Sequence, residues 1–343
     1  MRPWIPCLIG LLFASDLAPR AAPSPPDAAP APDEDAPMPI PRRPVHTYSI
    51  VARDRATGEL GVAVQSHWFS VGTAVPWAEA GVGAVATQSF TDPSYGALGL
   101  EMMRAGKPAP DALRGLLAGD PGREVRQVAM VDAQGRAAAH TGAKCIAAAG
   151  HEAADGFSVQ ANLMDRATVW PAMAKAYRAA KGDLADRMLA ALRAAQKEGG
   201  DIRGQQSAAL VIVAGKPTGK PWEDRLFDLR VEDHPDPLGE LERLVKLRRA
   251  YRLMDAGDGF VTAGKWDDAR KAYGEAAKIA PGVVEMPFWH AVALASAGRR
   301  SEALPIFKAV FAKEPAWKRL VPRLAEVGQL PKDPALLQAI DAQ

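Results

Sequence analysis

The sequence of 343 residues predicts an α+β domain, in which helices cover stacked antiparallel sheets, followed by an all-helical module. Three observations support this prediction. Strand hairpins alternate with pairs of helices, instead of single strands alternating with single helices. Beyond Pro237 the pattern is helical to the end of the chain. Within that helical part, a pattern of residues recurs after 34 positions, which indicates a structural repeat.

The N-terminal segment lacks the pattern of a folded domain. Arg2 precedes a short apolar run, residues 4–14, and small residues follow, which indicates an export signal over residues 1–22. The run is too short to span a bilayer as a helix, so a removed signal is favoured over an uncleaved anchor. Residues 23–46 are rich in Pro and Ala, as is typical of an extended, disordered linker. We therefore expect an exported protein, periplasmic or secreted, with ordered structure beginning at Thr47.

Residues 47–237 have the pattern of a mixed domain. Short apolar stretches, separated by turn residues such as those at 54–58, indicate strands. Two pairs of longer stretches between them indicate helices. Together they favour antiparallel sheets with helices on their outer faces. The predicted strands cover residues 48–53, 60–65, 82–88, 125–131, 136–141, 208–213 and 226–231, and the predicted helices cover residues 96–105, 111–118, 169–179 and 184–196.

Residues 238–343 contain the internal repeat. Small residues stand where two helices would cross, aromatic residues stand on the second helix, and a Pro closes each unit, which resembles the tetratricopeptide pattern. A pair of helical hairpins with accidental periodicity is the alternative. Because three repeats are usually needed for stability, we expect helices at 238–255 and 319–342 to pack on the repeats as caps. The matched pairs are Gly257 and Ala291, Phe260 and Leu294, Gly264 and Gly298, Ala269 and Ala303, Tyr273 and Phe307, Ala276 and Val310, and Pro281 and Pro315.

The composition excludes several classes of function. The net charge of +2 provides no strongly basic surface, so we expect no nucleic-acid partner. Cys7 lies in the predicted signal, which leaves Cys145 alone in the mature chain and rules out an internal disulfide. The six His residues lack metal-ligand spacing, and no phosphate-binding glycine loop with a Lys is present. We therefore expect no metal, no other cofactor and no stable membrane span.

Six stretches in the first domain resemble the bacterial DUF1028 family, whose function is unknown and which is placed structurally with the Ntn hydrolases. Each stretch alone is a weak signal, but together they cover most of the domain. The resemblance implies a four-layer αββα sandwich over residues 47–237. The stretches are TYSIVARD (47–54), GELGVAVQS (58–66), GVGAVATQS (81–89), RQVAMVDAQGRAAAHTG (126–142), GGDIRGQQSAAL (199–210) and DLRVEDHPDPLGEL (228–241).

The resemblance also singles out Thr47 as a catalytic residue. In Ntn hydrolases, the first residue of the mature chain is a Thr, Ser or Cys that starts a strand and attacks a carbonyl carbon. Its own α-amino group, with an ordinary pKa of about 7.7–8.0, takes the proton. Thr47 stands where the predicted linker meets the first strand. Cleavage between His46 and Thr47 is required, and Thr47 as a purely structural strand residue is the alternative.

A glycine-rich segment at 199–207 is the second candidate. Its backbone N–H groups could approach a carbonyl oxygen, and Asp201 and Arg203 could orient a substrate. The alternative is a structural turn in which Asp201 and Arg203 satisfy buried backbone groups. Asp201 and Arg203 are therefore predicted to be catalytic together with Thr47. The predicted substrate-binding residues are Gln88, Arg126, Asn162, Gly200 and Ser207, and Ser89 and Gln127 are weaker candidates.

Two functions remain open. The first is an exported amidohydrolase of the Ntn type. The alternative is a non-catalytic envelope protein whose repeats bind a protein or peptide in their groove. The absence of Lys between Thr47 and Gly106 favours the alternative, because proteasome-type Ntn hydrolases tune the nucleophile with a Lys on the third strand. Anchors for such a partner would be Trp266, Phe288, Trp289 and Trp317, which could equally belong to the core.

Overall fold

The protein is described from a computed structural model over residues 47–343, and the predicted signal and linker lie outside the described residues. Two antiparallel sheets form its α+β domain. The strands of the six-stranded sheet follow the order β10-β9-β2-β1-β8-β7, and those of the four-stranded sheet the order β3-β4-β5-β6. The strands are β1 (Thr47–Arg53), β2 (Leu60–Ser66), β3 (Pro76–Glu79), β4 (Gly83–Ser89), β5 (Arg126–Asp132), β6 (Ala137–Thr141), β7 (Gly150–Ala154), β8 (Phe157–Ala161), β9 (Ser207–Val213) and β10 (Arg225–Val231).

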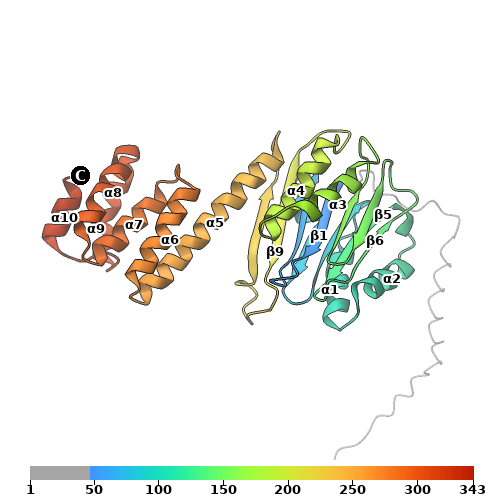
Figure 1. Cartoon of the computed structure of the whole chain (residues 1–343), viewed down its shortest axis with the longest axis horizontal. Coiled ribbons are helices and arrows are strands. Elements are labelled where there is room, and N and C mark those ends of the chain that lie inside the picture. The colour runs from blue at the N-terminus through green and yellow to red at the C-terminus, as the bar shows by residue number, and fades with distance from the viewer. Residues whose placement is uncertain (1–46) are drawn as a thin grey trace, which may run out of the picture. The chain divides into compact units, whose positions relative to one another are not determined.

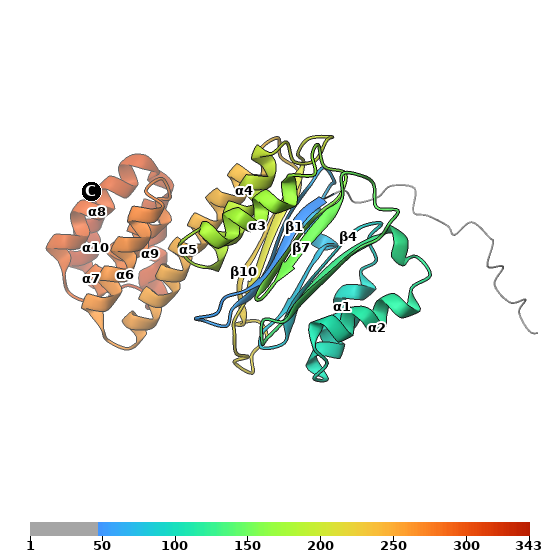
Figure 2. The same cartoon turned by 45° about the vertical axis from the view of Figure 1, so that its right-hand side comes forward.

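The sheets stack face to face, and helices cover their outer faces (Figures 1 and 2), which gives the four-layer αββα arrangement. Helices α1 (Ser94–Arg104) and α2 (Ala109–Gly119) pack on the four-stranded sheet, and α3 (Val169–Ala179) and α4 (Leu184–Lys197) on the six-stranded sheet. Short 3-10 helices occur at η1 (Val71–Thr73) and η2 (Arg123–Val125). The predicted fold class is confirmed.

Strand periodicity explains how each sheet can be buried on both faces. In β1, Tyr48, Ile50 and Ala52 face the helices, whereas Val51 belongs to the core between the sheets. All seven residues of β2 and of β9 are buried, because both strands are covered on both sides. Such strands consist of nearly continuous apolar residues. Buried polar residues on these strands are therefore exceptions, and their side chains are candidates for a functional site.

Three strands were not predicted from the sequence. Strand β3 is short, has only half-buried residues and begins with Pro76, which weakened its strand pattern. Strands β7 and β8 form a hairpin around Asp155 and Gly156, the latter with a positive φ of 86°. An Asp-Gly pair between two short stretches is a hairpin signal that was available in the sequence.

The C-terminal region is helical and its turns fall at the repeat spacing. Gly264 and Gly298 both adopt positive φ, 70° and 76°, at equivalent turns. Tyr273 and Phe307 are both buried, as the repeat predicts. The helices are α5 (Pro237–Thr262), α6 (Trp266–Ile279), α7 (Glu285–Ser296), α8 (Arg300–Lys313), η3 (Pro315–Leu320), α9 (Val321–Glu326) and α10 (Pro334–Asp341).

Helix α5 differs from the expectation of a separate cap over residues 238–255. It continues without a break into the first helix of the first repeat. Its beginning contributes Leu238, Leu241 and Val245 to the core of the six-stranded sheet, and its end contributes Ala250 and Met254 to the core of the first repeat. At the other end of the chain, the tail packs on the second repeat as expected, through residues of α9 and α10.

None of the helices within residues 47–343 is both long enough and apolar enough to cross a membrane.

Candidate functional site

Thr47 is buried at the start of β1, on the face of the six-stranded sheet that meets the other sheet. Its hydroxyl donates a hydrogen bond of 3.2 Å to the hydroxyl of Ser66, the residue opposite it on β2. Ser66 in turn is paired with Ser207 on β9. Three hydroxyl-bearing residues therefore occupy one row across three neighbouring strands.

Side-chain amides hold the backbone of Thr47. Its carbonyl oxygen accepts hydrogen bonds from the Nε2 of Gln88 (3.2 Å) and from the backbone N–H of Asn162 (3.1 Å). The Asn162 side chain is 3.5 Å from the same oxygen and 2.9 Å from the Oε1 of Gln127. Several donors therefore converge on the peptide group of Thr47 in an interior that excludes water, where hydrogen bonds are strong and their loss is costly.

These amides belong to a larger interior network that joins the two sheets. Gln88 on β4 donates to Gln127 on β5 (2.7 Å) and accepts from Ser49 on β1 (2.6 Å). Ser49 also accepts from Gln160 on β8 (2.6 Å). All these side chains are buried. Because each partner comes from a different strand, the network fixes both the spacing of the sheets and the position of Thr47 between them.

Asp201 is buried and forms an ion pair with Arg203 (2.7 Å). It also accepts a bond of 3.2 Å from the backbone N–H of His67, which follows Ser66 directly. Its other oxygen accepts from the backbone N–H and the Nε of Arg203. This carboxylate therefore fixes the end of β2, while the side chain of Arg203 stays 30% exposed.

Gly200 and Ser207 have local roles in the same region. Gly200 has a positive φ of 63°, and its carbonyl accepts from the N–H of Asp165. The Ser207 hydroxyl donates to the carbonyl of Trp68 and accepts from the N–H of Val71 (3.1 Å). Ser207 therefore secures the loop after β2, beside the end that Asp201 holds.

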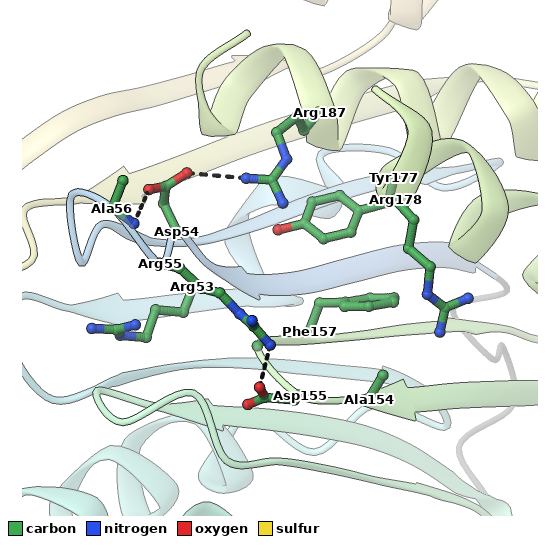
Figure 3. A pocket seen from close by; sticks show the side chains of 11 residues that line it. Arg53, Asp54, Arg55, Ala56, Ala154, Asp155, Phe157, Tyr177, Arg178 and Arg187 are labelled. Carbon is green, nitrogen blue, oxygen red and sulfur yellow. Dashed lines mark hydrogen bonds and ion pairs between the residues drawn. The ribbon is translucent and has the colours of Figure 1, made fainter. Parts of the chain in front are cut away.

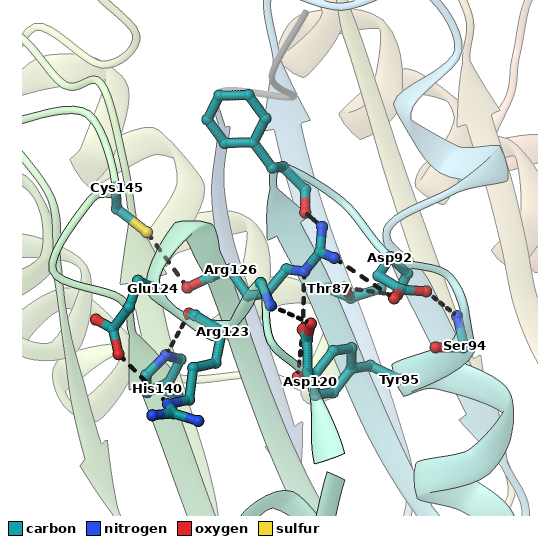
Figure 4. A network of polar contacts seen from close by, with 12 residues as sticks. Thr87, Asp92, Ser94, Tyr95, Asp120, Arg123, Glu124, Arg126, His140 and Cys145 are labelled. Atoms are coloured by element: carbon teal, nitrogen blue, oxygen red, sulfur yellow. Dashed lines mark hydrogen bonds and ion pairs between the residues drawn. The ribbon is translucent and has the colours of Figure 1, made fainter. Parts of the chain in front are cut away.

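Arg126 is engaged by a separate polar cluster at the start of β5 (Figure 4). Its guanidinium binds Asp120 (2.9 Å) and the carbonyl of Phe90 (2.7 Å), and Tyr95 donates to the same carboxylate (2.9 Å). Burial works against ionisation of Asp120, but Arg126, Tyr95 and the N–H of Gly122 outweigh it and lower the pKa of Asp120. These contacts connect the start of β5 to the loop after β4, which holds Phe90, and to the loop after α2, which holds Asp120.

The predicted site residues therefore divide into groups. Thr47, Gln88 and Asn162 come together, and Gln127, a weaker candidate, joins them. Asp201, Arg203 and Ser207 lie on the adjoining segment, connected through Ser66 and the residues after it. Arg126 pairs with Ser89, at the end of the strand that carries Gln88, but its side chain turns to Asp120.

Ser49 and Gln160 belong to this site although they were not predicted from the sequence. Ser49 stands two residues after Thr47 on β1, and Gln160 stands two residues before Asn162, which directly follows β8. Polar residues that recur with a period of two on a buried strand face share one side of the sheet. That alternation was the available signal. Within residues 47–343, no group of three or more His, Cys, Asp or Glu side chains is placed to hold a metal ion.

Comparison with known proteins identifies the first domain. No curated protein matches the chain. A crystal structure of a DUF1028 protein from Silicibacter pomeroyi is similar to it, with 31% sequence identity and a TM-score of 0.53, over 59% of this chain and 88% of that one. The family model described as "Family of unknown function (DUF1028)" matches residues 47–241, more than half of the sequence. The chain thus belongs to the DUF1028 family.

Proposed function

We propose that the protein hydrolyses amide bonds with Thr47 as its nucleophile. The observation that carries this proposal is the placement of Thr47: it begins β1, its hydroxyl contacts Ser66, and donors from Gln88 and Asn162 hold its carbonyl. A residue that must present both its hydroxyl and its own α-amino group benefits from a backbone fixed in this way. The four-layer αββα arrangement is also the architecture that the resemblance to the Ntn hydrolases implies.

The mechanism requires hydrolysis of the peptide bond between His46 and Thr47, which frees the α-amino group. The Thr47 Oγ1 then attacks the substrate carbonyl carbon while its proton passes to that amine. The tetrahedral intermediate collapses, the C–N bond breaks, and the leaving amine takes the proton from the ammonium. Water, deprotonated by the same amine, attacks the resulting ester, so that the carboxylic acid is released and Thr47 is restored.

The neighbouring residues act in this proposal by positioning. Asp201 holds the backbone just after Ser66, and Ser66 contacts the nucleophile. Arg203, whose side chain is 30% exposed, holds the Asp201 carboxylate in place through their ion pair.

The test combines processing with hydrolysis. We expect the mature protein, analysed by intact mass and N-terminal sequencing, to begin at Thr47 and to cleave members of an amide-substrate library. Thr47→Ala should abolish turnover, whereas Thr47→Ser, which keeps a hydroxyl and the amine, should retain a measurable fraction. A mature chain that begins at residues 15–23, with hydrolysis unaffected in Thr47→Ala, would refute the mechanism.

A second candidate function is supported by the helical repeats. A cavity of about 730 Å³, here called the repeat groove, lies among α5, α6, α7 and the loop after α9. Of the four predicted anchors, Trp266 and Trp289 line it. Phe288 and Trp317 instead contact each other in the core of the second repeat, with their rings tilted and the ring centroids 4.8 Å apart. The groove is therefore partly aromatic, which suits recognition of a peptide.

The negative charge of the repeat groove favours a positively charged partner. Asp255, Asp258 and Glu285 line it, and among the described residues no Lys or Arg does. Tyr273 donates to Asp258 (2.6 Å), and Tyr251 donates to Glu285 (2.5 Å), which raises the pKa of Tyr251 to about 12. Carboxylates held in place beside Trp rings favour Lys and Arg side chains, through ion pairs and cation–π contacts. The partner proposed is an extended basic peptide segment.

This binding is measurable on the full chain. A Lys- and Arg-rich peptide should bind in a salt-dependent manner, and a Glu-rich peptide of the same length should not. Asp255→Asn combined with Trp266→Ala should weaken binding about tenfold or more. Asp268→Asn, outside the groove, is the matched control and should bind as the wild type does. Equal binding of both peptides, or no effect of the groove variant, would refute the proposal.

A further inference from the structure

A cavity of the α+β domain lies at the opposite end of β1 from Thr47. It has a volume of about 510 Å³, and four arginines, Arg53, Arg55, Arg178 and Arg187, line it (Figure 3); we call it the arginine pocket. Thr47 and Arg53 are the first and last residues of β1, so about 20 Å of strand separates the arginine pocket from the candidate active site. The two sites are therefore distinct.

Ion pairs account for three of these arginines. Arg187 binds Asp54 (3.0 Å), Arg55 binds Asp155, and Arg178 binds Glu152 (2.5 Å). Burial works against ionisation of Asp54, but the backbone N–H groups of Thr57 and Ala56 and the charge of Arg187 outweigh it, so its pKa is lowered. Asp54 thus stays ionised and neutralises Arg187. The two carboxylates that line the pocket, those of Asp54 and Asp155, are both engaged by these pairs.

Arg53 is the exception. Among residues 47–343, no ion pair or hydrogen bond involves its side chain, and its Nε is buried. A half-buried guanidinium without a partner is costly, because water solvates it poorly and no protein acceptor replaces that water. The positive charge of Arg53 is therefore left over after every carboxylate lining the pocket has been assigned.

Tyr177 supplies a second unused donor to the same pocket. The residue is only 3% exposed, and its buried hydroxyl donates to no acceptor among the described residues. Arg187 stacks over the Tyr177 ring, with its guanidinium carbon 4.5 Å from the ring centroid, so it makes a cation–π contact. Burial raises the pKa of Tyr177, which keeps its hydroxyl protonated and able to donate.

We propose that the arginine pocket binds a small oxyanion, a phosphate or carboxylate group, through the guanidinium of Arg53 and the hydroxyl of Tyr177. An oxyanion supplies the two things that are missing: a negative charge for Arg53 and an acceptor for Tyr177. The cavity is larger than a phosphate ion and falls in the range of small-molecule sites, so the oxyanion would be the charged end of a larger molecule.

The experiment titrates the full chain with inorganic phosphate and, separately, with acetate, at constant ionic strength set by NaCl. Isothermal titration calorimetry should detect saturable binding of at least one anion. Binding of phosphate alone assigns a phosphoryl ligand, binding of acetate alone assigns a carboxylate, and binding of both supports an oxyanion site in general. Binding of neither up to about 10 mM, which corresponds to less than about 3 kcal/mol, would overturn the proposal.

Substitutions connect binding to the two unused donors. Arg53→Gln should weaken the affinity for the bound anion about tenfold, and Tyr177→Phe should weaken it severalfold. Arg114→Gln, on the exposed surface of α2, removes the same charge elsewhere and should leave the affinity unchanged. If Arg53→Gln and Arg114→Gln weaken binding equally, the effect comes from net charge, and the site is refuted.

Thermal unfolding provides an independent measurement in case a variant folds poorly. Without anion, Arg53→Gln should melt at the wild-type temperature or higher, because it removes a half-buried charge that has no ion-pair partner. With saturating anion, the melting temperature of the wild type should rise and that of Arg53→Gln should not. An equal rise in both would refute the role of Arg53. Thr47→Ala should bind the anion normally, so the outcome does not depend on the proposed hydrolase function.

Discussion

The hydroxyl oxygens of Thr47 and Ser66 lie 3.2 Å apart, at directly paired positions of β1 and β2. In the proposed hydrolase, this contact orients the nucleophile. Ser66→Ala should therefore lower kcat for amide hydrolysis about tenfold while changing the free energy of unfolding by no more than about 1 kcal/mol.

The matched control for Ser66 is Ser207, which occupies the same row but serves the loop after β2. Ser207→Ala should lower stability by about 1–2 kcal/mol, because the N–H of Val71 loses its acceptor. Its effect on kcat should be smaller than that of Ser66→Ala. Equal losses of activity in the two variants would argue against a specific role for the contact between Thr47 and Ser66.

Gln65 is buried on β2, and neither atom of its side-chain amide has a hydrogen-bond partner within the described part of the chain. An unsatisfied buried amide lowers stability, so Gln65→Met, which has a similar length, should raise the free energy of unfolding by about 1 kcal/mol. Urea unfolding followed by circular dichroism measures this change.

Gln127 is the control for Gln65, because its Nε2 donates to Thr141 and to the carbonyls of Gly150 and Ala161. Gln127→Met should therefore lower stability by about 2–3 kcal/mol. If Gln65→Met is also destabilising, a buried water molecule satisfies the Gln65 amide in solution, and our expectation for this position is wrong.

Substitution by Ala should change the free energy of unfolding in opposite directions at two glycines of α5. A Cβ at Gly257 would lie 2.4 Å from a ring carbon of Tyr273, whereas a Cβ at Gly259 would meet nothing within 4 Å. Gly257→Ala should lower stability by about 1–3 kcal/mol through overpacking, and Gly259→Ala should raise it by up to about 1 kcal/mol through helix propensity. Stabilisation by both would show that the α5–α6 contact is loosely packed.

Asp120 should make stability depend on acid pH. Its pKa in the folded protein is lowered from the unfolded value of about 3.9, so its contribution is complete above that value and is lost as the pH falls through the folded pKa. The melting temperature of the wild type should therefore fall more steeply below about pH 4 than that of Asp120→Asn. Glu223→Gln removes an exposed ion pair with Lys220 and should leave the slope unchanged.

Much of the fold was predictable because it depends on local periodicity. The buried strands β2 and β9 consist almost entirely of apolar residues, and the turn glycines Gly264 and Gly298 mark equivalent ends of repeated helices. Strand β3 escaped prediction because four residues with a leading Pro carry too little pattern. The fusion of the expected cap with the first repeat helix escaped it because no local residue distinguishes one long helix from two.

The candidate site was predictable only in part. Thr47 could be singled out through the family resemblance, and Gln88 as the polar end of a predicted strand. Asn162 follows β8, a strand that the sequence did not predict. The sequence could not reveal that Ser49 links Gln88 to Gln160, because that network depends on how two sheets stack. Arg126 illustrates the converse: its position beside Gln127 suggested the site, but the nearby carboxylate of Asp120 engages its guanidinium.

Helix α5 has one further consequence, because it supplies residues to the core of the six-stranded sheet and to that of the first repeat. If either core unfolds, the apolar residues that α5 contributes to it become exposed to water. This destabilises the helix and therefore also the other core. The two regions should therefore lose their structure cooperatively, in a single calorimetric transition. A gene fusion or truncation that cuts inside Pro237–Thr262 would damage both halves, so any transplant of the repeats onto another protein must carry this helix whole.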